Sequence, residues 1–224
     1  MQRIALHAWI AIAALAIATF SQSADACESC NNYQLSLAVQ HDDLDHAARE
    51  ARHEQRPAPF TEGSWTLDAV GFATSDVSPG ANADIYGTAI GGSYYFADAL
   101  AIRLETIGLA SYQSGDDAYG GGLGLHGRWH FLQRQNFTLF FEGGGGMIYT
   151  NVSLPDGDRA RNRDGTHFNF TATMILGLTY QLTENLHLNT GLRYIHISNA
   201  RRNGKKRNPA TEAVGGQLGL TWSF

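Results

Sequence analysis

From Trp65 to the C-terminus, apolar and polar side chains alternate residue by residue in about eight segments that turn residues separate. Alternation with a period of two is the pattern of a β-strand whose two faces meet different surroundings. In one such segment Leu100, Ile102 and Leu104 alternate with Arg103 and other polar residues. We therefore expect strands near 64–75, 83–96, 100–112, 118–131, 137–150, 167–181, 186–199 and 212–224.

Two all-β architectures fit this alternation: a soluble sandwich that hides the apolar faces, and a membrane barrel that turns them toward lipid. Charged residues on the polar faces favour the barrel, since they suit a small lumen filled by paired side chains. The last segment ends on Phe224, which resembles the C-terminal signal of bacterial outer-membrane barrels. Aromatic residues gather near the expected strand ends, as in interfacial girdles: Tyr94, Tyr95, Phe96, Trp129, Phe131, Tyr149, Tyr180, Trp222 and Phe224.

The connections between segments also follow a pattern. Those at 98–99, 133–136 and 183–185 are short, and the others are generally longer. Alternating short periplasmic turns and longer external loops are typical of outer-membrane barrels. The sequence thus predicts an eight-stranded antiparallel transmembrane barrel in the bacterial outer membrane, with the loop at 200–211 on the external side. A barrel of this size leaves a lumen that side chains just fill, which argues against a wide pore.

The first part of the chain differs from the barrel. Residues 1–26 are typical of a secretory signal peptide, and we expect 27–62 to form a periplasmic extension, as a short helix or a loose tail, before a barrel over 63–224. Cys27 and Cys30 could form a small disulfide loop, a redox pair or half of a zinc site, although no second ligand pair follows them. No apolar run in the mature chain is long enough for a transmembrane helix.

Composition excludes some classes of function. The chain has 16 basic and 21 acidic residues, a net charge of -5, whereas nucleic-acid-binding proteins are normally basic. The motif "GLGLHG" at 122–127 lies inside an expected strand, so it does not indicate a dinucleotide site. The inward-facing Arg103, Glu105, Arg128 and Glu142 are interpreted as a structural charge network. Nothing in the sequence calls for a metal or another cofactor.

The histidines of the barrel region fall on two faces. His126, His130, His167 and His187 have inward parity and are expected to be hydrogen-bonded in the lumen, whereas His196 has outward parity. A polar side chain on a lipid-facing line is costly unless it lies at the interface or has a function. The alternative is that the chain at 196–198 already lies above the membrane and begins a polar loop.

Ser198 and Glu212 share the outward parity of His196. Residues two apart on a strand face lie roughly 6–7 Å apart, and cross-strand neighbours about 4.5–5.5 Å apart at Cβ. Serine becomes nucleophilic beside a base that is itself oriented by an acceptor, and Ser198, His196 and Glu212 could supply these three groups.

The stretch "HISNA" at 196–200, followed by Glu212 near the end of a barrel with a C-terminal aromatic, resembles the PagL family of outer-membrane lipid A deacylases. The resemblance implies hydrolysis of an ester-linked acyl chain of lipopolysaccharide, at the 3-O position, without a cofactor. It assigns Ser198 as nucleophile, His196 as general base, Glu212 as its partner and Asn199 to the oxyanion hole. Glu212 follows His196 at an interval about two residues longer than in the family, and an even insertion preserves the strand face. Asn199 has inward parity, so its role requires a twist or a bulge.

The loop after this motif is basic. It is interpreted either as a site for lipid A phosphates or as a solvated loop attracted to any anionic surface. The sequence leaves two alternatives to a deacylase open: a non-enzymatic structural or adhesive barrel, and an esterase or acyltransferase that acts on another membrane lipid. The sequence leaves open whether the barrel forms a homodimer. The basic residues of the loop are Arg201, Arg202, Lys205, Lys206 and Arg207.

Overall fold

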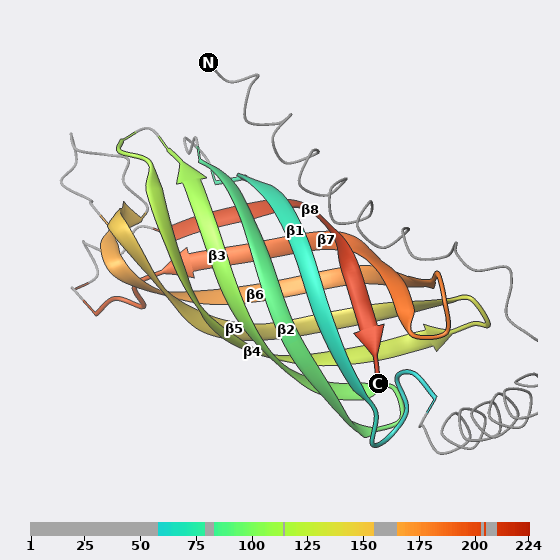
Figure 1. Cartoon of the computed structure of the whole chain (residues 1–224). Helices are drawn as coiled ribbons and strands as arrows, with labels where there is room; N and C mark the ends of the chain where they lie inside the picture. Colours follow the sequence, from blue (N-terminus) through green and yellow to red (C-terminus); the bar gives the residue numbers. More distant parts are fainter. Residues whose placement is uncertain (1–57, 79–82, 114, 155–164, 203, 205–209) are drawn as a thin grey trace, which may run out of the picture. The chain divides into compact units, whose positions relative to one another are not determined.

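The computed structural model describes residues 58–78, 83–113, 115–154, 165–202, 204 and 210–224. Eight antiparallel strands follow one another around a closed barrel, in which β1 pairs with β8 (Figure 1). The predicted barrel is therefore confirmed. The strands are β1 Trp65–Asp76, β2 Asp84–Ala97, β3 Leu100–Tyr112, β4 Ala118–Gln133, β5 Phe137–Leu154, β6 Thr166–Gln181, β7 Leu186–Ser198 and β8 Ala210–Ser223.

The N-terminal part of the chain up to residue 57 lies outside the described residues, and with it the expected signal peptide, most of the extension, Cys27 and Cys30. Among the residues that are described, none forms a helix long and apolar enough to cross a membrane.

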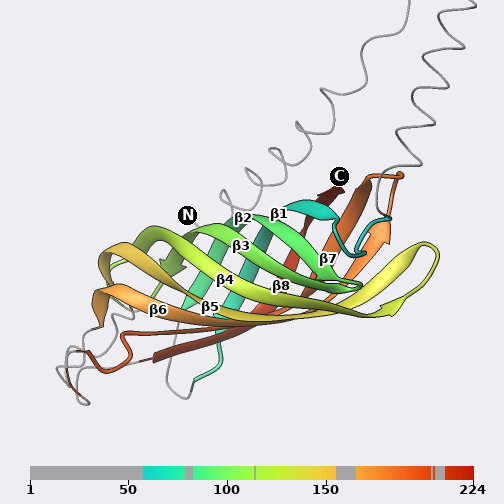
Figure 2. The same ribbon diagram turned by 90° about the horizontal axis from the view of Figure 1, so that it is seen from below.

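The strands turn their apolar side chains outward. Ile102 and Leu104 on β3 are 53% and 60% exposed, whereas the intervening Arg103 is 2% exposed. This arrangement excludes the soluble sandwich, which would bury the apolar face, and agrees with a wall that meets lipid. Strands that are neighbours in the chain lie side by side in both views (Figures 1 and 2). The short connections and the end of β8 define the periplasmic end of the barrel, and the longer loops define the external end.

Buried charges fill the middle of the lumen. Arg128 Nε donates to Glu142 Oε2 at 2.6 Å, and Arg103 Nε donates to Asp68 Oδ2 at 3.0 Å. Arg193 Nη2 donates to Glu105 at 3.2 Å, so no carboxylate of this cluster lacks a guanidinium. Buried ions require such pairing, because desolvation of an isolated charge is unfavourable by several kcal/mol. We call the cluster the luminal charge network: Asp68, Arg103, Glu105, Arg128, Glu142 and Arg193.

Toward the external end the lumen is apolar. Ile195 and Ile197 of β7 are fully buried there, next to the last two outward residues of that strand. The lumen is therefore filled by side chains above the charge network, as expected for an eight-stranded barrel. The buried members of this apolar cluster are Phe72, Ile85, Ile107, Leu109, Ala118, Ile148, Leu154, Ile195, Ile197 and Ala213.

A short segment before β1 covers the periplasmic end. Phe60 is 4% exposed and stacks on His130, with ring centroids 4.4 Å apart, and it meets His187 edge-on at 5.1 Å. Its carbonyl accepts a hydrogen bond from Ala99 N at 2.9 Å. Tyr95, predicted for the aromatic girdle, is instead fully buried here, and its hydroxyl lies 2.9 Å from His130 Nε2. We call residues 58–64, with Phe60 at their centre, the periplasmic cap.

Candidate active site

The register of the last strands sets His196 at a defined level of the outer wall. On β7, Arg193, Ile195 and Ile197 are buried in the lumen, so His196 between them points outward. Its direct cross-strand partner on β8 is Glu212. His196 and Glu212 therefore lie side by side on the outer face of the strands, near the ends that the longer loops connect.

Ser198 is the next outward residue of β7 and its last residue. The distance between His196 Nε2 and Ser198 Oγ is 3.0 Å, a hydrogen bond whose donor depends on the histidine tautomer. On the other side of the ring, His196 Nδ1 lies 3.7 Å from Glu212 Oε1. A hydrogen bond here needs an approach of roughly 0.5–1 Å. Such distances commonly shorten only when substrate is bound.

Burial differs among the three residues. The side chains of His196 and Glu212 are 31% and 50% exposed on the wall, whereas Ser198 is 8% exposed. Behind them, the fully buried Ile195 and Ile197 anchor the strand in the apolar lumen. A site on a strand that is packed from behind is held more firmly than one on a loop.

Chemically, the arrangement suits acyl transfer. With Nδ1 carrying the proton toward Glu212, His196 Nε2 is the acceptor for the Ser198 hydroxyl proton, which is how a neutral imidazole activates serine. Glu212 then favours the imidazolium that forms. The site opens to the side of the barrel, where a membrane lipid lies, and not to the lumen.

Asn199 follows directly after β7, where the strand alternation ends. It is 1% exposed, and its Oδ1 accepts a hydrogen bond from Arg201 N at 3.0 Å. The chain departs from strand geometry here, since Ala200 and Arg201 have φ angles of 51° and 63°. The chain thus turns directly after Asn199, whose own side chain is buried.

The predicted phosphate-binding residues are only partly described. Arg201 and Arg202 are exposed at the external end, and the Arg202 guanidinium lies over the ring of Phe168 at 5.3 Å. Lys205, Lys206 and Arg207 lie outside the described residues.

The other barrel histidines separate into two groups. His126, His130 and His187 are buried in the lumen, as predicted. The prediction for His167 was wrong: it is exposed near the external end of β6, and its Nδ1 lies 3.0 Å from Thr150 O. Its ring stacks on that of the exposed Tyr149, with the ring centroids 6.0 Å apart.

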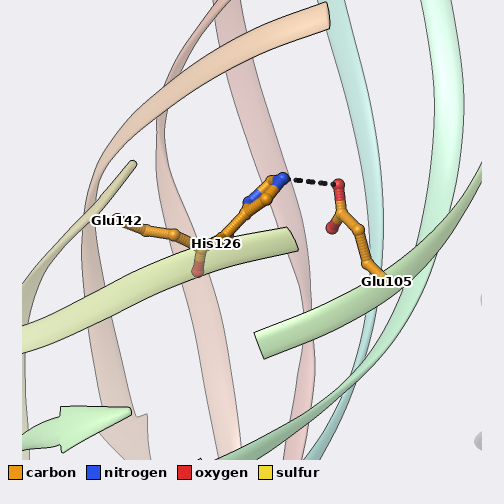
Figure 3. A group of neighbouring side chains, drawn as sticks. All are labelled: Glu105, His126 and Glu142. Atoms are coloured by element: carbon orange, nitrogen blue, oxygen red, sulfur yellow. Dashed lines mark hydrogen bonds and ion pairs between the residues drawn. The ribbon is translucent and has the colours of Figure 1, made fainter. Parts of the chain in front are cut away.

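One cluster has the composition of a metal site. Ligand atoms of Glu105, His126 and Glu142 lie within 4.8 Å of one another, and all three residues are buried (Figure 3). However, Arg103 pairs with both carboxylates, and His126 Nδ1 lies 2.8 Å from Glu142 Oε1. A divalent cation here would have to displace guanidinium groups from their carboxylates, so the residues fit ion pairing better than metal binding.

Sequence reasoning missed several residues around these sites. Asp68 and Arg193 belong to the luminal charge network, and their polar parity within otherwise apolar segments was the available signal. Phe170, the cross-strand partner of Ser198, adjoins the candidate site and was visible only as an outward apolar residue.

Several solved outer-membrane barrels are similar to this chain, and the first named here supports the fold. Neisserial surface protein A matches with a TM-score of 0.52 and 17% identity, over 72% of this chain and 96% of that one. The outer membrane enzyme PagL matches with a TM-score of 0.49 and 19% identity, over 69% and 97% of the two chains. The N-terminal barrel domain of Pseudomonas aeruginosa OprF matches with a TM-score of 0.47 and 20% identity, over 73% of this chain and 98% of that one. No curated protein matches the sequence.

The sequence itself matches a family model. The family is described as lipid A 3-O-deacylase (PagL), and the match covers residues 88–221, more than half of the chain. It runs from within β2 to within β8 and includes the strands that carry Ser198, His196 and Glu212. The chain therefore belongs to the PagL family of lipid A deacylases, and its barrel is an outer-membrane barrel.

Proposed function

We propose that this protein hydrolyses the 3-O-linked acyl ester of lipid A, with Ser198 as nucleophile, His196 as general base and Glu212 as the carboxylate that orients the imidazole. The observation that carries the proposal is the 3.0 Å contact between His196 Nε2 and Ser198 Oγ, on a wall where Glu212 directly faces His196. Family membership supplies the substrate class.

The reaction proceeds in two halves. Ser198 Oγ attacks the ester carbonyl while His196 Nε2 takes its proton, and a tetrahedral intermediate forms. The intermediate collapses by breaking the bond to the sugar oxygen, which receives the proton from His196, and the acyl chain remains on Ser198. Water then attacks the acyl-enzyme with His196 again as base, which releases a fatty acid and restores the serine.

Asn199 is the proposed oxyanion residue. It directly follows the nucleophile. Its Oδ1 accepts a hydrogen bond from Arg201 N, and the amide N–H groups of its side chain are the proposed donors to the oxyanion. A donor placed at the developing oxyanion contributes roughly 10²–10³ in kcat. The basic residues of the following loop, Arg201, Arg202, Lys205, Lys206 and Arg207, are proposed to bind lipid A phosphates.

The location of the site fits a lipid substrate. Lipid A in the outer leaflet lies beside the barrel wall, so its ester can reach Ser198 without entering the protein. The lumen, packed with apolar side chains at the external end, has no part in this route.

The test is hydrolysis of purified lipid A by the purified protein, followed by mass spectrometry of both products. Wild type should release one hydroxy fatty acid and leave lipid A lighter by that acyl group, whereas Ser198→Ala should release none. Ser75→Ala is the matched control, because Ser75 is a serine on the outer face of β1 near the external end that bonds Asp84 instead of a histidine. Lipid A that stays intact with wild type, or is cleaved equally by Ser198→Ala, would refute the proposal.

A further inference from the structure

The chain adopts a disfavoured backbone directly after Ser198. Ala200 and Arg201 are consecutive non-glycine residues with φ of 51° and 63°. This left-handed region is disfavoured for an L-residue, because Cβ comes too close to the following carbonyl oxygen. Two hydrogen bonds hold the turn: Arg202 N donates to Asn199 O at 3.1 Å, and Arg201 N donates to Asn199 Oδ1 at 3.0 Å. Strain of this kind persists where the surroundings enforce it, and it is often found at functional sites.

The turn brings Arg202 back to the outer wall. Its Cζ lies 5.3 Å from the centre of the Phe168 ring. Phe168 in turn meets Phe170 edge to face at 5.3 Å, and Phe170 is the cross-strand partner of Ser198. A continuous series of contacts on β6 therefore fixes the position of this cation relative to the nucleophile.

The contacts from Ser198 through Phe170 and Phe168 to Arg202 run toward the external end of the barrel. Phe168 and Phe170 are two residues apart on β6, roughly 6.5 Å along the strand, and Phe168 is nearer the external end. Arg202 is therefore displaced from Ser198 toward the side where the headgroup of an outer-leaflet lipid lies. A guanidinium that lies over an aromatic ring keeps its N–H donors in its own plane, where a phosphate can accept two of them.

We propose that Arg202 is the residue that anchors a phosphate of the substrate headgroup, and that Phe168 and the strained turn at Ala200 and Arg201 are positioning residues that hold it at a fixed distance from Ser198. The proposal rests on the proposed function and deepens it, because it singles out one cation of a basic loop and gives the physical reason for its position. Phe168 gains a role that its apolar, outward position does not suggest.

The test compares two substrates that share the same acyl ester, phosphorylated lipid A and lipid A from which the phosphates have been removed. Arg202→Gln should raise KM for the phosphorylated substrate by about tenfold at unchanged kcat, as for loss of a charge-assisted contact. Phe168→Leu should raise the same KM by roughly two- to fivefold and should add nothing when Arg202 is already Gln. Neither variant should change KM for the dephosphorylated substrate. Arg134→Gln, in the periplasmic turn between β4 and β5, is the control for charge.

The turn is tested separately. Ala200→Gly accepts the left-handed conformation without strain and should keep the wild-type KM. Ala200→Val disfavours it and should raise KM as Arg202→Gln does. Folding of every variant is checked by heat-dependent migration in gels. Equal effects of Arg202→Gln on both substrates, additive losses with Phe168→Leu, or an unchanged KM in Ala200→Val would overturn the positioning role.

A binding measurement keeps this inference separate from the proposed function. The Ser198→Ala protein is titrated with micelles of each lipid, with inorganic phosphate as a competitor that reveals binding of the phosphate group alone. Phosphate-dependent binding that Arg202→Gln abolishes supports the anchor even if wild type hydrolyses neither lipid, in which case only the proposed function fails. Hydrolysis of both lipids by wild type, with binding and KM that Arg202→Gln leaves unchanged, refutes the anchor and leaves the proposed function standing.

Discussion

His196 and Glu212 face each other as direct partners across β7 and β8, and 3.7 Å separates Nδ1 of the histidine from Oε1 of the glutamate. The strand register fixes the level of the two residues, while the side chain of Glu212 keeps freedom to approach. An approach of roughly 0.5–1 Å by the Glu212 side chain would bring the two atoms within hydrogen-bond distance.

The first prediction compares how much activity is lost when His196 or Glu212 is replaced. His196→Asn should lower kcat by roughly 10²–10⁴, the range expected for loss of a general base. Glu212→Gln should retain more activity than His196→Asn, because the carboxylate acts through the imidazole and not on the substrate. The measurement is the rate of fatty acid release.

Matched controls exist for both changes. His167→Asn alters an exposed histidine near the same rim, and Glu184→Gln alters an exposed glutamate in a periplasmic turn. Both should keep wild-type rates. If Glu212→Gln proves fully active, Glu212 does not serve the imidazole.

The second prediction concerns the luminal charge network. Glu142→Gln leaves Arg128 with a weaker partner in a buried site and should lower the free energy of unfolding by about 3 kcal/mol. The measurement is urea unfolding in lipid vesicles. The deacylation rate of the folded fraction should not change, since the candidate site lies on the opposite side of the wall. A variant as stable as wild type would show that the network contributes no net stability.

The third prediction addresses Glu105, His126 and Glu142 as a metal site. Because Arg103 and Arg128 already pair with the carboxylates, adding Zn²⁺ or a chelator should leave the thermal unfolding midpoint unchanged. A midpoint that rises with Zn²⁺ in wild type and not in His126→Gln would reveal metal binding, since a ligand that binds only the folded state stabilises it.

The fourth prediction concerns the periplasmic cap. Phe60→Ala removes a buried ring that stacks on His130 and should lower the free energy of unfolding by about 3 kcal/mol. Its φ of 66° makes the native packing important, because an aromatic residue rarely adopts this conformation without compensation. Glu62→Ala, at an exposed position of the cap, is the control, and a Phe60→Ala protein with wild-type unfolding would show that the cap is dispensable.

Much of the barrel could be predicted because period-two alternation and the direction of the apolar face are properties of the sequence alone. The ends of the strands were harder to predict from the sequence. β5 continues to Leu154 and β8 begins at Ala210, since backbone pairing extends beyond the alternation that marked 137–150 and 212–224. Tyr95 was assigned to the aromatic girdle by residue type, although it has the buried parity of Ser93 and lies between the exposed Tyr94 and Phe96.

The candidate site could be predicted from the sequence for a similar reason. Parity alone placed Ser198, His196 and Glu212 on one face, and the register decides that His196 and Glu212 are direct partners. The turn at Ala200 and the contact of Arg202 with Phe168 could not be predicted, because non-glycine residues in the left-handed region carry no reliable sequence signal.

The most direct test of the central claim, an activated serine on the outer wall, is labelling with a fluorophosphonate followed by peptide mass spectrometry. The account predicts one adduct, on Ser198, which Ser198→Ala abolishes and His196→Asn strongly slows. Labelling of another serine, or an unlabelled Ser198 in protein that deacylates lipid A, would contradict it.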